Sequence, residues 1–87
     1  MLASGVASML VAYIRQAVGR ARYAVLEDGA VAATVPGLRG VIAVGRTKAA
    51  CRRELASVIE EWVLVRVARG LRVPKLGGVE VRVKRAS

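Results

Sequence analysis

Histidine and phenylalanine are absent from this 87-residue chain, cysteine occurs once, and acidic residues number only six. Without histidine there is no imidazole to act as a general base near neutral pH. A two-metal nuclease site needs several carboxylates that converge on neighbouring strands. The acids instead fall in two adjacent pairs and two single positions: Glu27, Asp28, Glu54, Glu60, Glu61 and Glu80. We therefore expect a protein that is not an enzyme, with no catalytic residue, no metal site and no cofactor.

Disulfide pairs and long apolar runs are also lacking. A single cysteine, Cys51, excludes a disulfide within the chain and is typical of a reducing cytoplasm. Its place in an apolar helical stripe predicts a small buried side chain rather than a reactive thiol. The apolar run from Val6 to Ile14 is shorter than the roughly 20 residues of a membrane span, and Arg15 interrupts it. We predict a cytoplasmic protein that has no membrane contact.

Aromatic residues make up 3% of the chain, although apolar residues as a whole make up 55%. The core is therefore predicted to be aliphatic and rich in alanine, arranged around the single Trp62. Such an apolar composition excludes a disordered chain. A chain of this size buries roughly 60–65% of its unfolded surface, so its core is modest and we expect self-association.

Positive charge, in contrast, is abundant. Fifteen Lys and Arg against six Asp and Glu give a net charge of +9, and 12 of the 15 cations lie from Arg39 onward. A field of this sign attracts polyanions and acidic proteins. Arg-rich surfaces that are simply solvated have the same composition, so charge alone leaves both interpretations open.

The first half of the chain predicts a helix followed by three strands. Apolar residues recur at helical spacing within residues 4–19. Three β-favouring segments follow, at residues 23–26, 30–35 and 41–44. Glu27-Asp28-Gly29 separates the first two, and Asp-Gly is typical of a hairpin turn because type I′ geometry requires positive φ. Pro36 to Gly40, with two glycines, forms the next loop.

The second half predicts one long helix and a last strand. Thr47 is expected to cap the helix, and Gly70 to end it. Pro74 and the glycine pair at 77 and 78 then indicate a connector. Beyond it, valines alternate with charged residues at positions 79–83, which predicts a half-exposed strand. The apolar stripe of the helix consists of Cys51, Leu55, Val58, Ile59, Trp62 and Val65.

The predicted order of elements is therefore α-β-β-β-α-β in a single domain spanning residues 1–87, with an N-terminal helix at 4–19 and a core at 22–84. We expect an α+β fold: an antiparallel three-stranded meander plus a fourth strand, with the long helix packed on one face. No internal repeat or linker divides the chain.

This pattern of turns resembles the HicB family, the antitoxin halves of toxin–antitoxin pairs. The matching residues are Tyr23, Glu27, Asp28, Gly29, Pro36, Leu38, Gly40, Gly45, Thr47 and Trp62, with Leu55, Ile59 and Glu60 fitting the helix. The resemblance implies a truncated ribonuclease-H-like sheet in a homodimer or homotetramer. It also implies a partner, a small HicA-like toxin that cleaves RNA and whose active surface the antitoxin masks. Many family members add a C-terminal DNA-binding module that residues 1–87 do not contain, so we do not expect operon repression from these residues alone.

Under this resemblance, the candidate partner-binding residues belong to the acidic turn and the loop that follows the second strand: Glu27, Asp28, Pro36, Leu38 and Arg39. The exposed edge of the fourth strand is a further candidate. Gly37, Arg39 and Arg46 stand where the family is usually acidic or has proline. An RNA-binding toxin is expected to be basic, so a +9 inhibitor would repel it. Either the toxin is acidic, the contact is mainly apolar, or the chain has another function.

The alternative is a small basic RNA-binding module. The order α-β-β-β-α also occurs in double-stranded-RNA-binding domains, where basic residues at the start of the second helix contact phosphates. The corresponding residues here are Arg46, Lys48, Arg52 and Arg53, and the helix dipole would reinforce their charge.

Overall fold

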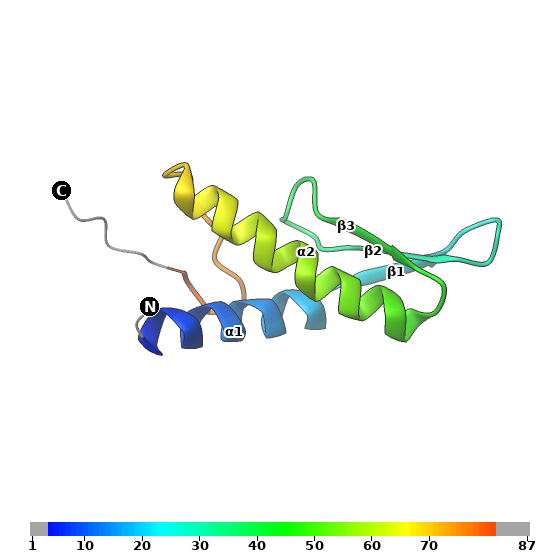
Figure 1. Cartoon of the computed structure of the whole chain (residues 1–87), viewed down its shortest axis with the longest axis horizontal. Helices are drawn as coiled ribbons and strands as arrows, with labels where there is room; N and C mark the ends of the chain where they lie inside the picture. Colours follow the sequence, from blue (N-terminus) through cyan, green and yellow to red (C-terminus); the bar gives the residue numbers. More distant parts are fainter. Residues whose placement is uncertain (1–3, 82–87) are drawn as a thin grey trace.

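The structure is a computed structural model, and it describes residues 4–81 (Figure 1). Its elements are α1 (Ser4–Gly19), β1 (Arg22–Val25), β2 (Val31–Thr34), β3 (Ile42–Gly45) and α2 (Lys48–Ala68). The strands form one antiparallel sheet in the order β1-β2-β3. The long helix α2 crosses one face of this sheet, α1 lies beside α2, and the β1–β2 hairpin projects away from both helices (Figure 1). The predicted α+β fold, with its first helix, three strands and long second helix, is confirmed.

The junction between β3 and α2 is tightly packed, because the chain turns back onto its own sheet there. Thr47 has extended backbone angles and its Oγ1 accepts a hydrogen bond from the Ala50 N–H at 3.0 Å, so it caps α2 as predicted. Gly45 ends β3 against the first turn of α2: a Cβ at this position would lie 2.4 Å from the Cys51 backbone nitrogen. Glycine at position 45 is therefore what lets the helix approach the sheet.

The helix ends as the sequence predicts. Arg69 is its C-cap, and its N–H donates to the Val65 carbonyl at 3.0 Å. Gly70 follows with φ of +70°, the left-handed conformation that glycine adopts without steric cost. Leu71 donates its N–H back to the Arg66 carbonyl at 2.8 Å, which turns the chain toward α1.

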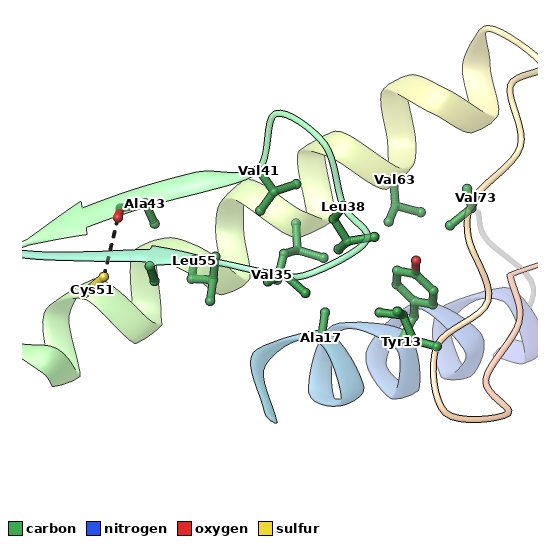
Figure 2. Close-up of a cluster of buried hydrophobic side chains, with 13 residues drawn as sticks. Tyr13, Ala17, Val35, Leu38, Val41, Ala43, Cys51, Leu55, Val63 and Val73 are labelled. Atoms are coloured by element: carbon green, nitrogen blue, oxygen red, sulfur yellow. Dashed lines mark hydrogen bonds between the residues drawn. The ribbon is translucent and has the colours of Figure 1, made fainter. Parts of the chain in front are cut away.

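The core lies between α2, the sheet and α1 (Figure 2). The buried stripe of α2 has a strict four-residue spacing: Cys51, Leu55, Ile59 and Val63. The prediction that Trp62 forms the centre of the core is wrong, since Trp62 is half-buried at the margin and Val65 is 43% exposed. Tyr13 of α1 fills the centre instead and is fully buried, because its ring reaches the space beyond the end of the short sheet.

The predicted fourth strand is absent from the described residues. Residues 71–81 form no strand beyond an isolated bridge between Leu76 and Val79 that spans the glycine pair. Val73 and Leu76 are buried, and the Tyr13 hydroxyl donates a hydrogen bond to the Pro74 carbonyl. Side chains rather than a β-ladder hold this segment, since proline lacks a ladder donor. Residues 82–84, the end of the predicted core, lie outside the described residues.

Candidate interaction site

One face of the sheet is left open. The cross-strand row Tyr23, Ala33 and Ala43 faces α2, and alternation along the strands places six residues on the opposite side. These are Arg22, Ala24, Ala32, Thr34, Ile42 and Val44, which we call the open face. Ile42 is 57% exposed and Val44 51%. Arg22, at one corner, is the single charged residue among the six. Contiguous exposed aliphatic side chains of this kind mark interaction surfaces.

The β1–β2 hairpin ends in an apolar and acidic tip, residues 25–28, which we call the hairpin tip. Val25 is 76% exposed and Leu26 42%, and both acids, Glu27 and Asp28, are exposed. The Asp28 Oδ1 accepts a hydrogen bond from the Ala30 N–H at 3.0 Å, and the Leu26 N–H donates to the Ala30 carbonyl at 2.7 Å. The tip is therefore held in one conformation before any partner arrives.

The turn type differs from the one that Asp-Gly suggested. A type I′ turn requires positive φ at both central residues, but among residues 4–81 no residue other than glycine has positive φ. In this turn only Gly29 has positive φ, at +86°, and its N–H donates to the Leu26 carbonyl at 2.9 Å. This is the longer hairpin loop that closes with a left-handed glycine, in which Asp28 keeps ordinary φ and uses its carboxylate to hold the loop.

The loop from Pro36 to Gly40 consists of two successive turns, each with a left-handed glycine in its third position. The Leu38 N–H donates to the Val35 carbonyl at 3.1 Å, and the Val41 N–H to the Leu38 carbonyl at 3.3 Å. Every third residue thus points inward. Leu38, 3% exposed, belongs to the core, which corrects its prediction as a contact residue. Pro36 and Arg39 are exposed, as a contact would require.

The predicted partner-binding residues do not converge on one point. The hairpin tip precedes β2 and the loop follows it, so Glu27 and Asp28 lie at one end of the sheet and Pro36 and Arg39 at the other. The open face lies between them. Sequence reasoning placed contacts at its two ends and missed Ile42 and Val44, although their alternation with Ala43 contained the signal.

A shallow groove of about 340 Å³ runs along the second half of α2 and is bounded by the segment after Gly70. We call it the α2 groove; its lining residues are Val58, Glu61, Trp62, Val65, Arg66, Arg69 and Leu71. The Arg66 guanidinium lies 4.8 Å from the centre of the Trp62 ring, and its Nε donates to the Arg72 carbonyl at 2.7 Å. The Trp62 Nε1–H donates to the Arg39 carbonyl at 3.1 Å. The Trp62 ring, which forms one wall of the groove, is therefore held by the Arg66 guanidinium and by the Arg39 carbonyl.

The residues proposed for nucleic-acid contact form a basic corner at the start of α2. Arg46, Lys48, Arg52 and Arg53 are all exposed, and the first turn of α2 has no acidic residue. Arg52 lines a second groove, of about 280 Å³, together with Arg15 of α1. The Lys48 ammonium lies 4.8 Å from the centre of the Tyr23 ring, which holds it close to β1. Arg53 does not line this groove, so the structure brings together a subset of the predicted cations and adds Arg15.

The described part of the chain contains neither a metal-binding cluster nor a membrane-spanning helix. Within residues 4–81, no group of three or more Cys, Asp or Glu side chains is arranged to hold a metal ion. Neither α1 nor α2 combines the length and the hydropathy that crossing a bilayer requires.

The open antiparallel sheet, the single crossing helix and the helix beside it define a small α+β fold. A family model described as UPF0150-like matches residues 12–74, and the chain belongs to this family, which is part of the HicB/antitoxin-like group. The crystal structure of TTHA0281 from Thermus thermophilus is similar, with a TM-score of 0.81 and 32% sequence identity over 88% of this chain and 96% of that one. No curated protein matches the chain.

Proposed function

We propose that this chain is a non-catalytic, antitoxin-like protein that binds and occludes a small RNA-cleaving protein of the HicA type. The observation that carries the proposal is the exposed aliphatic open face, with Ile42 and Val44 on its edge strand β3, in a family linked to toxin–antitoxin-like systems. A chain with no histidine and a rigid, solvent-facing apolar surface is suited to binding rather than to catalysis.

The distribution of charge makes the open face the favourable place for a basic partner. The chain carries a net charge of +9, and an RNA-binding toxin carries positive charge as well, so most approaches are repulsive. On the open face, one residue in six is cationic. At its hairpin end, the carboxylates of Glu27 and Asp28 are exposed and attract cations. Contact is therefore mainly apolar, at about 25 cal/mol per Å² of buried apolar surface, with attraction at one end.

Occlusion follows from the shape of this surface. A partner that docks on the open face meets a sheet about four residues long, bordered by the hairpin tip at one end and by the Pro36–Gly40 loop at the other. In the proposed complex, the RNA-contacting surface of the toxin faces this sheet. The toxin is then inactive because RNA has no access, and no chemistry is required of the antitoxin.

The experiment is growth rescue in cells that express a HicA-type protein, with the product of the neighbouring gene as the one to test; unopposed, such a protein is expected to arrest growth. Ile42→Lys/Val44→Lys removes the apolar contact while leaving the buried face of β3 unchanged. Val11→Lys/Leu64→Lys is the matched control, since these residues are 54% and 46% exposed and lie on the helices. We expect wild type and the control to restore growth and the sheet variant to fail. Equal rescue by both variants would contradict the proposal.

A second candidate function, RNA binding, is favoured by one observation: Arg15 of α1 and Arg52 of α2 line the same groove. Phosphate contacts from such a corner predict affinity for duplex RNA that falls steeply with salt. Arg52→Glu/Arg53→Glu should abolish that binding. The two functions separate cleanly, because Ile42→Lys/Val44→Lys should leave RNA affinity intact.

A further inference from the structure

Two surfaces outside the open face have complementary chemistry. The first is the hairpin tip, which projects from the body of the molecule (Figure 1) and combines two exposed aliphatic side chains with the carboxylates of Glu27 and Asp28. Within the described residues, no hydrogen bond or ion pair engages the Glu27 side chain, whereas Asp28 is used to hold the loop. The tip is thus a preformed segment that carries both apolar and negative groups.

The second surface is the α2 groove. Val58, Val65 and Leu71 supply aliphatic wall, and Leu71 is 47% exposed. Arg66 and Arg69 supply guanidinium groups at the same place, against the single carboxylate of Glu61. The Nε of Arg66 is engaged by the Arg72 carbonyl, which orients its guanidinium over the Trp62 ring. An occupant that satisfies this groove needs aliphatic side chains and at least one carboxylate.

We propose that the hairpin tip of one copy docks in the α2 groove of a second copy. Val25 and Leu26 would then cover the aliphatic wall, and Glu27 would lie against Arg69. The contact goes beyond the proposed function, because it needs no toxin and uses α2 rather than the open face. It joins two different surfaces of the same chain, which is a heterologous contact.

The charge balance favours a second copy over a polyanion in this groove. A nucleic-acid phosphate would pair with Arg66 and Arg69 but would leave Val65 and Leu71 facing water and would meet the Glu61 carboxylate. The hairpin tip offers apolar and acidic groups together, two residues of each kind in sequence. In a chain of +9 net charge, contact through its own acidic tip also reduces the repulsion between copies.

The hairpin tip also borders the open face, where the toxin is proposed to dock. A docked partner and a second copy therefore compete for the tip. The self-contact itself is measured on the purified chain alone, where no toxin is present to compete.

The test is sedimentation velocity of the full chain over a concentration series, with charge-reversed variants. Glu27→Arg places a guanidinium at the tip position that would face Arg69, and Arg69→Glu places a carboxylate at the groove position that would face Glu27, so each variant sets like charges against each other. Each should weaken self-association by at least about tenfold. An equimolar mixture of the two should recover it, because the new arginine at position 27 of one variant then meets the new glutamate at position 69 of the other, while the unchanged Glu27 of the second meets the unchanged Arg69 of the first. Glu60→Arg and Arg53→Glu are the controls: they change the net charge by the same amounts at exposed α2 positions outside the groove.

Recovery in the mixture, with little effect of the two controls, supports the proposed contact. Overturning results are a mixture that associates no better than its components, controls that weaken association as much as the groove variants, or a wild-type chain that stays monomeric. Failure here leaves the growth rescue of the proposed function untouched, because that assay depends on Ile42 and Val44.

Discussion

The Trp62 indole donates its Nε1–H to the backbone carbonyl of Arg39 at 3.1 Å, which joins the second half of α2 to the loop between β2 and β3. Trp62 is thus a clamp at the margin of the core rather than its centre. It fixes one wall of the α2 groove and, through the loop, the start of β3, where Ile42 of the open face begins the strand. One side chain therefore supports both proposed surfaces.

Trp62→Phe should reduce the free energy of unfolding by about 0.5–1.5 kcal/mol, because a smaller aromatic ring takes the place of the indole and the hydrogen bond to the Arg39 carbonyl is lost. Urea unfolding followed by circular dichroism measures this change without relying on indole fluorescence. Arg39→Ala is the matched control, since Arg39 contributes its backbone carbonyl and its exposed side chain makes no described contact with Trp62. Equal destabilisation by the two variants would contradict the clamp.

Gly45→Ala should destabilise the protein by about 1–3 kcal/mol or more, because the added Cβ would overlap the backbone of the first turn of α2. The Cys51 Cα, at 2.8 Å from that Cβ position, cannot move without shifting the helix. Gly19→Ala is the control: nothing beyond its chain neighbours and the nearby backbone of its own helix lies within 4 Å of its Cβ position, and alanine in a helix is neutral or stabilising by up to about 1 kcal/mol. Thermal unfolding of both variants is the measurement: Gly45→Ala should lower the unfolding temperature, and Gly19→Ala should not.

Stability should decline at alkaline pH because of Tyr13. Burial raises the pKa of its hydroxyl, and the nearby Arg66 guanidinium partly offsets this rise. The folded state therefore holds the Tyr13 proton more tightly than the unfolded state. The contribution of Tyr13 to the free energy of unfolding is complete below the ordinary tyrosine pKa of about 10. It is lost as the pH rises from there toward the pKa of Tyr13 in the folded protein.

The measurement is the urea midpoint of wild type and Tyr13→Phe from neutral pH to above pH 10. The variant is less stable at neutral pH, since the hydrogen bond to the Pro74 carbonyl is gone. However, the difference in urea midpoint between wild type and Tyr13→Phe should shrink as the pH rises past about 10, because only wild type has this phenol to ionise. A difference that stays constant over the whole range would exclude the proposed linkage.

Cys51 should be inert toward thiol reagents in the native protein. Its side chain is fully buried, and its Sγ–H donates to the Ala43 carbonyl at 3.6 Å (Figure 2). Reagents that form mixed disulfides should react with Cys51 readily once the protein is unfolded in urea. In the native protein, the reaction rate should be limited by local opening of the fold around Cys51. Reaction at the rate of a free thiol without denaturant would show that the β3–α2 junction opens readily.

Local signals in the sequence predicted the helices, the strands and the α2 cap, because Thr47, Gly70 and the glycine-containing turns act on their immediate neighbours. The sequence misled where long-range packing decides. Trp62 and Val63 are adjacent on α2, and periodicity cannot tell which one faces a sheet that is only three strands wide. Val79 and Val81 have strand spacing, yet no neighbouring strand pairs with them within residues 4–81. Their side chains pack against the core instead, and Tyr13 and Arg66 bond the chain just before them, at the carbonyls of Pro74 and Arg72.

The candidate sites also divide into one that local sequence signals predict and others that depend on long-range packing. The hairpin tip was predictable because acids next to glycine report a turn. The α2 groove was not, since Trp62, Arg69 and Leu71 meet only after Gly70 reverses the chain. Leu38 appeared available because it lies in a loop, but two successive turns rotate it inward.

The central claim is that the open face occludes an RNA-cleaving partner. The most direct test is RNA cleavage by the purified partner protein, titrated with this chain at low and at high salt. We predict stoichiometric inhibition that persists at high salt, because the contact is mainly apolar, and its loss in Ile42→Lys/Val44→Lys but not in Val11→Lys/Leu64→Lys. No inhibition by wild type, or full inhibition by the open-face variant, would contradict it.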